Sequence, residues 1–381
     1  MNNNVDVEKY DMSKFLVPYW RGKISYAEAA FVREDENGYI CPVTLLYPIG
    51  RIVSVRSADL KKLYREGADY IVENGKLKIL RSGNIPVLRY ADFYHAHYED
   101  EGLKTQFPAA DNSGGGYIVA EMSHTSKGMS AWCLACTYVH DEISLISPPR
   151  DKSDMFPVLN ANLKEKKSFK TVFYGDSITF GWSATALEQI NLPPYCPSYC
   201  NMAMDFLESK FDVKIPRANL SVSGKMTPWA KQPENLEKVI AEKPDFVILA
   251  FGMNDGAEIS TENFCANTDE IVRTLRKNLK NMEIAVVLPM LPNDKVGYKP
   301  GTTLRKNHLA NAAQMKKVER AWIDGGIPAA VVDVTGIHHS MLKYKTFQDF
   351  ASSNTNHPND YTHRLYAQIL LKTIIGENYY E

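Results

Sequence analysis

The sequence has few cysteines, no long hydrophobic run and no excess of charge of either sign. Six cysteines in 381 residues are too sparse for a disulfide scaffold. The longest apolar run, residues 246–253 (FVILAFGM), is less than half of the roughly 20 residues that a membrane-spanning helix needs. Lys and Arg number 44 against 45 Asp and Glu, a net charge of −1. We therefore expect no disulfide framework, no membrane span and no nucleic-acid partner.

Targeting and cofactor signals are also missing. The first fifteen residues (MNNNVDVEKYDMSKF) lack the basic stretch and apolar run of a secretory signal, so the sequence predicts a cytoplasmic protein with reduced cysteines. The glycines at 114–116 are not followed by the Lys-Ser/Thr pair of a phosphate-binding loop. Cys133 and Cys136 have the spacing of a metal pair, but no second pair accompanies them. We expect neither a cofactor nor a metal.

Residues 1–150 are predicted to form a β-rich domain. Their apolar residues come in short alternating runs separated by turn signals. The clearest hairpin is at residues 69–80 (DYIVENGKLKIL), where Asn74 and Gly75 suit the positive φ angles of a tight turn. Further strands are expected at 39–46, 86–94, 117–122 and 131–140. Many short strands at this spacing favour a β-sandwich of the jelly-roll kind.

After a polar, proline-containing stretch, predicted to be a linker at residues 151–168, the pattern changes. In residues 169–381, apolar runs of strand length alternate with longer amphipathic segments. Strands are expected at 170–174, 218–222, 246–251, 283–288 and 329–334, and helices at 198–211, 233–242, 261–281, 308–324 and 358–375. This alternation predicts an α/β domain with a mostly parallel sheet covered on both faces.

The first strand of this second domain is followed by a candidate nucleophile. Residues 174–181 read YGDSITFG, which puts Ser177 directly after the carboxyl end of a buried strand, beside a glycine that allows a sharp turn. On its own the segment is equally compatible with a simple helix cap made by Asp176 and Ser177.

Three further segments support the catalytic interpretation. Gly224 lies in a turn after a strand (residues 219–229, NLSVSGKMTPW), and Asn254 follows the strand FVIL (residues 250–256, AFGMNDG). His357 lies in NTNHPND, where Pro358 suits the first position of the last helix. Because the carboxyl ends of parallel strands meet at one edge, the four segments can converge.

These four segments resemble the conserved blocks of the SGNH, or GDSL-type, hydrolase family: GDS with Ser177, a glycine block with Gly224, GxND with Asn254 and an HP block with His357. The resemblance covers about residues 170–375. It implies a flavodoxin-like three-layer α/β/α fold and ester hydrolysis.

Physical chemistry assigns roles to the same residues. A serine hydroxyl needs a base to attack an ester at neutral pH, and His357 is the candidate base for Ser177. The oxyanion that forms needs fixed donors. We expect the N–H groups of Ser177 and Gly224 and the side-chain amide of Asn254 to supply them, and water activated by His357 to release the acyl group.

One position departs from the family pattern. The family usually has aspartate three residues before the histidine, but this chain has Asn354. Asp360 or Asp349 can supply the missing acid, or a backbone carbonyl can orient the ring in a Ser-His dyad, the alternative that we favour. Asp176 and Asp255 are expected to tie loops together.

The sequence therefore predicts a serine esterase for a short acyl group, acetyl above all, on a small-molecule or oligosaccharide ester. The β-rich region ahead of the hydrolase resembles carbohydrate esterases with an N-terminal jelly roll, and those relatives tolerate the loss of the aspartate. The alternatives are a lipase or thioesterase for longer acyl chains, and a carbohydrate-binding protein with a decayed hydrolase domain. The sequence leaves the sugar, its hydroxyl and the oligomeric state open.

Overall fold

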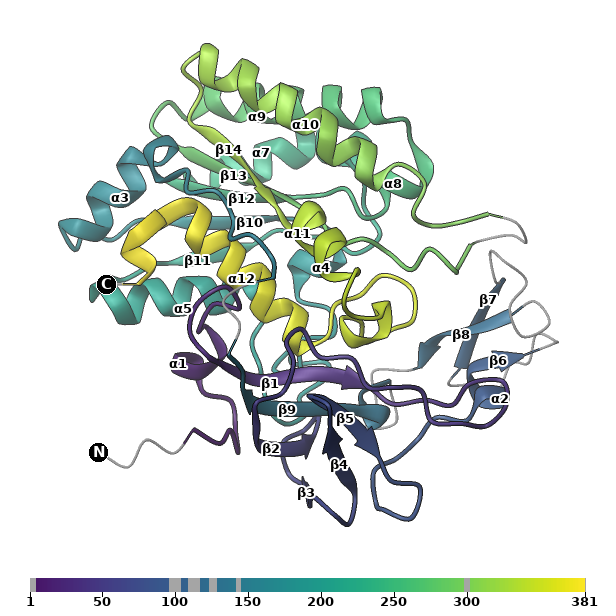
Figure 1. Cartoon of the computed structure of the whole chain (residues 1–381). Coiled ribbons are helices and arrows are strands. Elements are labelled where there is room, and N and C mark those ends of the chain that lie inside the picture. The colour runs from purple at the N-terminus through teal and green to yellow at the C-terminus, as the bar shows by residue number, and fades with distance from the viewer. Residues whose placement is uncertain are drawn as a thin grey trace.

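A five-stranded parallel sheet forms the centre of the second half of the chain (Figure 1). The computed structural model describes residues 5–95, 104–108, 117–122, 129–141, 145–297 and 302–380. The strands, in their order across the sheet, are β11 (Arg217–Asn219), β10 (Thr171–Gly175), β12 (Phe246–Ala250), β13 (Glu283–Leu288) and β14 (Ala329–Asp333). All neighbouring pairs are parallel, so the carboxyl ends of the strands share one edge.

Helices cover both faces of this sheet, which confirms the predicted α/β arrangement. The longer ones are α3 (Pro157–Lys164), α5 (Tyr199–Phe211), α7 (Pro233–Ala241), α9 (Thr261–Asn278), α10 (His308–Asp324), α11 (Val334–Met341) and α12 (Asp360–Ile375). The four-residue helices are α4 (Ser177–Phe180), α6 (Thr227–Ala230) and α8 (Asp255–Glu258), with single 3-10 turns at Ser153–Met155, Phe347–Asp349 and Gly376–Tyr379.

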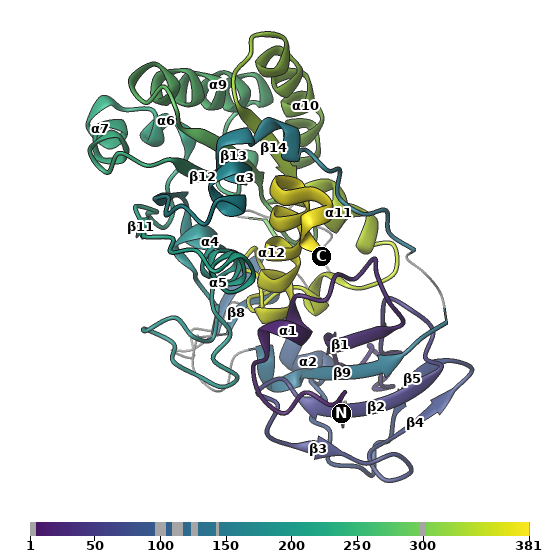
Figure 2. The same ribbon diagram turned by 90° about the vertical axis from the view of Figure 1, so that its left-hand side faces the viewer.

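Alternating side chains along each strand build two separate cores. In β10, Val172 and Tyr174 pack with helices α7, α9 and α10 on one face, whereas Phe173 packs with α5 and α12 on the other. Figure 2 shows the resulting order: the helices α7, α9 and α10, the sheet, and then α5 and α12. Strands β10, β12 and β13 are buried throughout, as the continuous apolar runs of the sequence predict.

The N-terminal region contains antiparallel sheets. One has the order β1 (Ile24–Phe31), β9 (Cys133–Val139), β2 (Arg51–Ser57) and β3 (Leu63–Tyr64). A second has the order β6 (Tyr94–His95), β8 (Tyr117–Met122) and β7 (Lys104–Pro108), and β4 (Tyr70–Glu73) pairs with β5 (Lys76–Ile79). Helices α1 (Met12–Phe15) and α2 (Tyr90–Phe93) and a 3-10 turn at Met129–Trp132 complete the region.

The predicted hairpin is confirmed, with Asn74 at φ 52° and Gly75 at φ 70° between β4 and β5. The strands expected at 39–46 and 86–94 are wrong. The first segment makes only the isolated bridges Glu34–Ile40 and Val43–Leu77, and the second is mostly the isolated bridge Arg33–Leu88 followed by helix α2. Antiparallel β structure is present as expected. That the sheets make a sandwich or jelly roll remains a prediction.

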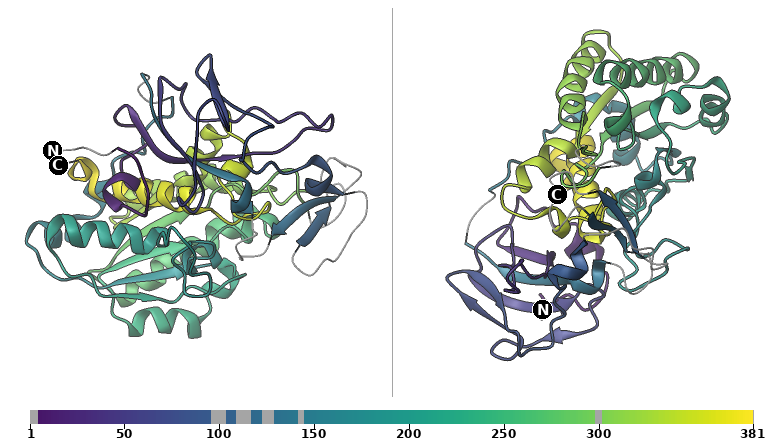
Figure 3. Two further views of the ribbon diagram at one scale, coloured as in Figure 1. Left: turned by 90° about the horizontal axis from the view of Figure 1, so that it is seen from below. Right: turned by 90° about the vertical axis from the view of Figure 1, so that its right-hand side faces the viewer.

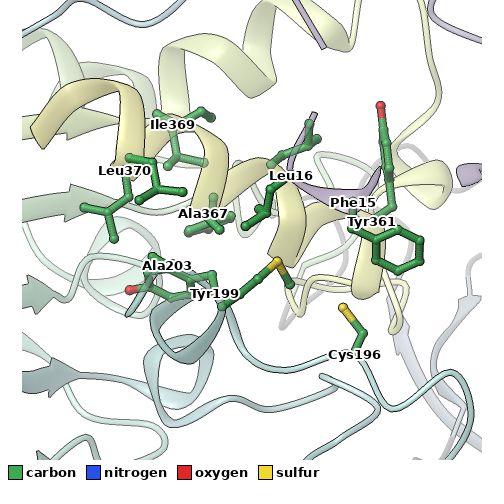
Figure 4. Close-up of a cluster of buried hydrophobic side chains, with 14 of the residues drawn as sticks. Phe15, Leu16, Cys196, Tyr199, Ala203, Tyr361, Ala367, Ile369 and Leu370 are labelled. Carbon is green, nitrogen blue, oxygen red and sulfur yellow. The ribbon is translucent and has the colours of Figure 1, made fainter. Parts of the chain in front are cut away.

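The N-terminal sheet shares one hydrophobic core with the α/β region. Phe15 and Leu16 pack in the same cluster as Tyr361 of α12 and Tyr199 of α5, and Figure 4 draws these side chains within that cluster. Strands β1 and β9 thus lie next to α12, while α9 and α10 lie at the opposite end of the molecule (Figures 1 and 3).

The segment predicted to be a linker, residues 151–168, is structured. It contains α3, whose Leu159 and Leu163 are buried. Glu283 at the start of β13 accepts hydrogen bonds from the backbone N–H groups of Val158 (2.7 Å) and Leu159 (2.8 Å), so it satisfies donors in the first turn of that helix. The domain boundaries themselves, 1–150 and 169–381, remain a prediction. None of the helices in the described ranges has the length and apolarity to cross a bilayer.

Candidate active site

Ser177 lies in a tight turn between β10 and α4. Strand β10 ends at Gly175, where an added Cβ would be 2.4 Å from the carbonyl oxygen of Ala250 on the neighbouring strand, so only glycine fits. Asp176 then caps α4 by accepting a hydrogen bond from Ile178 N at 3.0 Å. The helix ends after one turn at Gly181, with φ 110°. These constraints place Ser177 at the first position of a short helix, at the carboxyl edge of the sheet.

The structure brings Ser177 and His357 together. Ser177 Oγ lies 2.9 Å from His357 Nε2, although the two residues are 180 positions apart. This is hydrogen-bond distance, and it lets the imidazole take the hydroxyl proton. The two groups have the geometry of a nucleophile and its base.

The His357 loop closes on itself just before α12. Ala351 bridges to Pro358, and the carbonyl of His357 accepts a hydrogen bond from Ser352 N at 3.0 Å. The expectation that Pro358 opens the final helix is wrong. Helix α12 begins at Asp360 and is capped by Asn359, whose side chain accepts from Thr362 N at 3.0 Å.

The glycine block and the GxND block are joined to each other and to the serine turn. Val222 N donates to the carbonyl of Gly175 at 2.9 Å, which ties the loop of Gly224 to the end of β10. Asn254 Nδ2 donates to the carbonyl of Lys225 at 3.1 Å. Gly224 has φ +73°, and an added Cβ there would meet nothing within 4 Å. The loop residue next to Gly224 is therefore fixed by Asn254 itself.

The two buried aspartates of these loops hold backbone in place, as expected. Asp255 accepts hydrogen bonds from the N–H of Thr227 (2.8 Å) and from its hydroxyl, joining α8 to α6. Burial raises the pKa of Asp255. Burial also raises the pKa of Asp176 to about 7, and the nearby charge of Asp255 adds to the rise. Both carboxyls have backbone partners in the loops that surround Ser177.

Asn354 and the two aspartates considered as the acid of a triad, Asp360 and Asp349, have other partners. Asn354 is fully buried, and its Oδ1 accepts from Asn293 Nδ2 (2.9 Å) and Gln348 Nε2 (2.8 Å). The oxygens of Asp360 accept from the N–H (3.0 Å) and the hydroxyl (2.8 Å) of Thr185. In the described part of the chain, the structure does not bring the Asp360 carboxylate to His357.

Asp349 bridges two distant parts of the chain. Its Oδ1 accepts from Phe31 N of β1 at 2.7 Å, and its Oδ2 accepts from Thr44 Oγ1 at 2.9 Å and from Thr346 N at 2.7 Å. The last of these contacts belongs to a capping box over residues 346–349. Sequence reasoning missed Thr44 and Phe31 as partners because nothing in the local pattern points across about 300 positions.

Three other histidines of the α/β region are structural. His308 Nε2 contacts the carbonyl of Met253 at 3.0 Å, His363 Nε2 contacts that of Trp182 at 3.1 Å, and His338 Nδ1 accepts from Leu291 N at 3.0 Å. Burial lowers the pKa of His308 and His363 to about 4 and that of His338 to about 3. They remain neutral at pH 7.

A cavity of about 470 Å³ lies between the N-terminal sheet and the α/β region. Its walls are mostly apolar, with Leu60, Met129 and Leu134 on one side and Leu192 and Tyr361 on the other. Segments that follow Ser177 and flank His357 contribute to the lining, but neither of these two residues lines it. The cavity therefore adjoins the Ser-His pair and is distinct from it.

Comparison with known proteins gives one family match and several solved structures that align with part of the chain. The family model of the GDSL-like lipase/acylhydrolase family matches residues 173–365. A two-domain esterase (CEX) active on acetylated mannans aligns at a TM-score of 0.45 with 17% identity, over 61% of this chain and 55% of its own. An acetylxylan esterase from Geobacillus stearothermophilus (Axe2) aligns at 0.43 with 20% identity, over 54% of this chain and 94% of its own.

The protein thus spans about half the length of the mannan esterase. No curated protein matches the sequence. The family model spans just over half of the chain and includes Ser177, Gly224, Asn254 and His357. The match agrees with the SGNH resemblance of the four sequence blocks, and the chain belongs to the GDSL-like lipase/acylhydrolase family of ester hydrolases.

Proposed function

We propose that this protein is a serine esterase that removes short acyl groups, acetyl above all, from a carbohydrate. Ser177 is the nucleophile and His357 the general base. The observation that carries the proposal is the 2.9 Å contact between Ser177 Oγ and His357 Nε2 at the carboxyl edge of the parallel sheet. Ester hydrolysis is the family's reaction, while the residue roles and the substrate are our proposal.

The chemistry follows from this pair. Ser177 Oγ attacks the ester carbonyl carbon while its proton moves to His357 Nε2. When the tetrahedral intermediate collapses, the imidazolium returns that proton to the sugar oxygen, and the bond between this oxygen and the acyl carbon breaks. Water then attacks the acyl-enzyme and gives one proton to the same nitrogen. The imidazolium returns this proton to Ser177 Oγ as the bond between Oγ and the acyl carbon breaks, which releases the carboxylic acid and free Ser177.

The oxyanion of each tetrahedral intermediate needs preorganised donors. We assign them to the N–H groups of Ser177 and Gly224 and to the side chain of Asn254. An amide nitrogen carries two hydrogens. One N–H of Asn254 donates to Lys225, so the second can serve the oxyanion while the first holds the Gly224 loop.

Within the part of the chain that the structure describes, a Ser-His dyad fits the surroundings of Ser177 and His357 better than a triad completed by Asp360 or Asp349. Asn354 is neutral, and its Oδ1 already accepts from two amides. The carboxylates of Asp360 and Asp349 are held by Thr185 and by Phe31, Thr44 and Thr346. We propose that a neutral group orients His357, as in relatives that lack the aspartate.

The acetyl and carbohydrate parts of the proposal rest on a resemblance to carbohydrate esterases of the family. Two features of this chain support it: a β-rich N-terminal region precedes the hydrolase, and Asn354 stands where the family usually has aspartate. Folds do not fix substrates. The apolar cavity beside the pair supports a second candidate, an esterase or thioesterase for longer acyl chains, because such chains require an apolar pocket of several hundred Å³.

Hydrolysis of p-nitrophenyl esters from acetate to octanoate, and of acetylated oligosaccharides, tests both candidates. We expect wild-type activity to be highest on acetate and to be lost in Ser177→Ala. A rise in kcat/KM with chain length would favour the longer-chain candidate. Sugar binding with no Ser177-dependent turnover would indicate a decayed hydrolase. Labelling with a fluorophosphonate, followed by mass mapping, reports directly whether Ser177 is activated.

A further inference from the structure

We infer that Glu28, Lys345 and Asp349 are positioning residues for His357: strand β1 of the N-terminal region holds the segment that carries the catalytic histidine. The inference rests on the proposed role of His357 and goes beyond it, because it makes the N-terminal region part of the catalytic apparatus. In Figure 1, the yellow segment between α11 and α12 lies beside α4 and against β1.

Lys345 is the centre of the connection. Its side chain is completely buried, and its ammonium group lies 2.7 Å from Glu28 Oε1. The same nitrogen donates to the carbonyls of Ala29 (2.9 Å) and Thr44 (2.8 Å). All three acceptors belong to the N-terminal region, so the three donor positions of the ammonium group are used there. Although burial favours the neutral amine, the charges of Glu28 and Asp349 raise the pKa of Lys345.

Glu28 is equally well held. It is 1% exposed, its Oε1 also accepts from Leu46 N at 2.7 Å, and its Oε2 accepts from the hydroxyl of Tyr138 at 2.8 Å. A buried ion pair with this many additional hydrogen bonds has one geometry available to it. Residue 345 is therefore fixed relative to β1.

Asp349, four residues further on, makes the second attachment. It is fully buried, and its two oxygens take the backbone N–H of Phe31 at the end of β1 and the hydroxyl of Thr44. It also closes the capping box on its own turn. The turn at residues 346–349 thus has an attachment to the N-terminal region at each end.

Side-chain hydrogen bonds connect this turn to the His357 loop. Gln348 Nε2 donates to Asn354 Oδ1 at 2.8 Å, in the middle of the loop. Asn359 Nδ2 donates to the carbonyl of Asp349 at 2.9 Å, and Asn359 N to that of Phe350 at 3.0 Å, at the end of the loop. A shift of residues 345–349 would therefore displace the loop at both points. Catalytic groups tolerate displacements of about 0.5 Å, so the loss of these anchors is expected to slow the chemical step.

The test compares two double variants. Glu28→Gln with Lys345→Met removes both charges of the ion pair, and glutamine still offers an acceptor to Leu46 N, while Asp349 keeps its hydrogen bonds from Phe31, Thr44 and Thr346. The matched control is Lys152→Met with Glu319→Gln, which removes an ion pair of 2.5 Å that also bonds to backbone, at Val331. The control pair joins residue 152 to α10, away from the His357 loop.

With p-nitrophenyl acetate, we expect the Glu28/Lys345 variant to lose kcat by about tenfold or more while KM changes by less than about threefold. The control variant should keep the wild-type kcat even if its Tm falls as much as that of the Glu28/Lys345 variant. Asp349→Asn, which keeps an acceptor, should retain more kcat than Asp349→Ala. Unchanged kcat in the folded Glu28/Lys345 variant, or an equal loss in the control, would overturn the inference.

A readout without substrate separates this inference from the proposed function. The protein is labelled with ¹⁵N at histidine, and the His357 ring signal is assigned by its absence in His357→Ala. We expect the pH midpoint of this signal to differ from that of wild type in the Glu28/Lys345 variant and to equal it in the control. An unchanged titration overturns the positioning role. If wild type and Ser177→Ala are equally inactive on every ester while the titration moves, the proposed function fails and the positioning of His357 stands.

Discussion

Asn354, three residues before His357 in the sequence, accepts on its Oδ1 a hydrogen bond of 2.8 Å from Gln348 Nε2. The position where the family usually has a carboxylate is thus occupied by a neutral side chain held by amides on two sides, since Asn293 Nδ2 is the other donor at 2.9 Å. The same two donors could hold a carboxylate at residue 354.

Asn354→Asp is therefore expected to be tolerated and to change the pH dependence of catalysis. A negative charge near the imidazole favours the imidazolium and raises the pKa of His357. The base is active in its neutral form, so the acid limb of kcat/KM should move to higher pH, by about one unit. A pH profile on p-nitrophenyl acetate measures the shift. A limb that stays in place or moves to lower pH would show that a carboxylate at residue 354 does not stabilise the imidazolium of His357.

Gly224→Ala should lose activity beyond its effect on stability. A residue with a side chain at φ +73° costs roughly 1–2 kcal/mol, although the added methyl group meets nothing within 4 Å. Relief of this strain would turn the Gly224 N–H away from the oxyanion. We expect kcat to fall by about tenfold or more, measured by steady-state kinetics.

Gly326→Ala is the matched control for Gly224. Gly326 has φ +64°, also with open space around its Cβ position, and it follows α10 in the turn before β14. It should show a similar loss in the free energy of unfolding with unchanged kcat. Equal kcat in the two variants would exclude Gly224 from the oxyanion hole.

The sequence was sufficient where the structure depends on local pattern. The buried strands of the parallel sheet appear as apolar runs, and the Ser177 turn appears as a strand followed by glycine and a helix cap, so the meeting of Ser177 and His357 at one edge was predictable. The Glu28–Lys345 pair, 317 positions apart, was not, because an isolated charge in a strand gives no sign of its partner. The segment of α3 was predicted to be a linker for the same reason. Its packing depends on Glu283, which lies far away in the sequence.

Asp360 should give the protein a stability that falls as pH rises. Burial raises its pKa to about 7 from an ordinary value of 3.8, although hydrogen bonds from Thr185 oppose the rise. Between these values the folded protein keeps a proton that the unfolded chain has released, so the stabilisation is complete below about pH 4 and is lost toward pH 7.

Asp360→Asn removes this titration. The free energy of unfolding of wild type minus that of Asp360→Asn should therefore be larger at pH 5 than at pH 8, by about 2 kcal/mol. Asp176, whose pKa is also raised to about 7, is present in both proteins and cancels in the difference. Urea unfolding at the two pH values measures it. A difference that is constant, or that grows with pH, would show that Asp360 is ionised throughout.

Asn254→Asp tests the dual role assigned to the Asn254 amide. Aspartate has nearly the same shape, but as a carboxylate it cannot donate to the Lys225 carbonyl at 3.1 Å, and it brings negative charge to the site of the oxyanion. Loss of one oxyanion donor typically lowers kcat by about 10²–10³.

The control is Asn235→Asp, because Asn235 is buried and its Nδ2 donates to the carbonyl of Trp229 at 2.9 Å in the same way. Both variants should lower Tm, since each loses a partly buried hydrogen bond. Only Asn254→Asp should lower kcat on p-nitrophenyl acetate, and a comparable kcat loss in Asn235→Asp would mean that Asn254 acts through the stability of the fold rather than on the reacting ester.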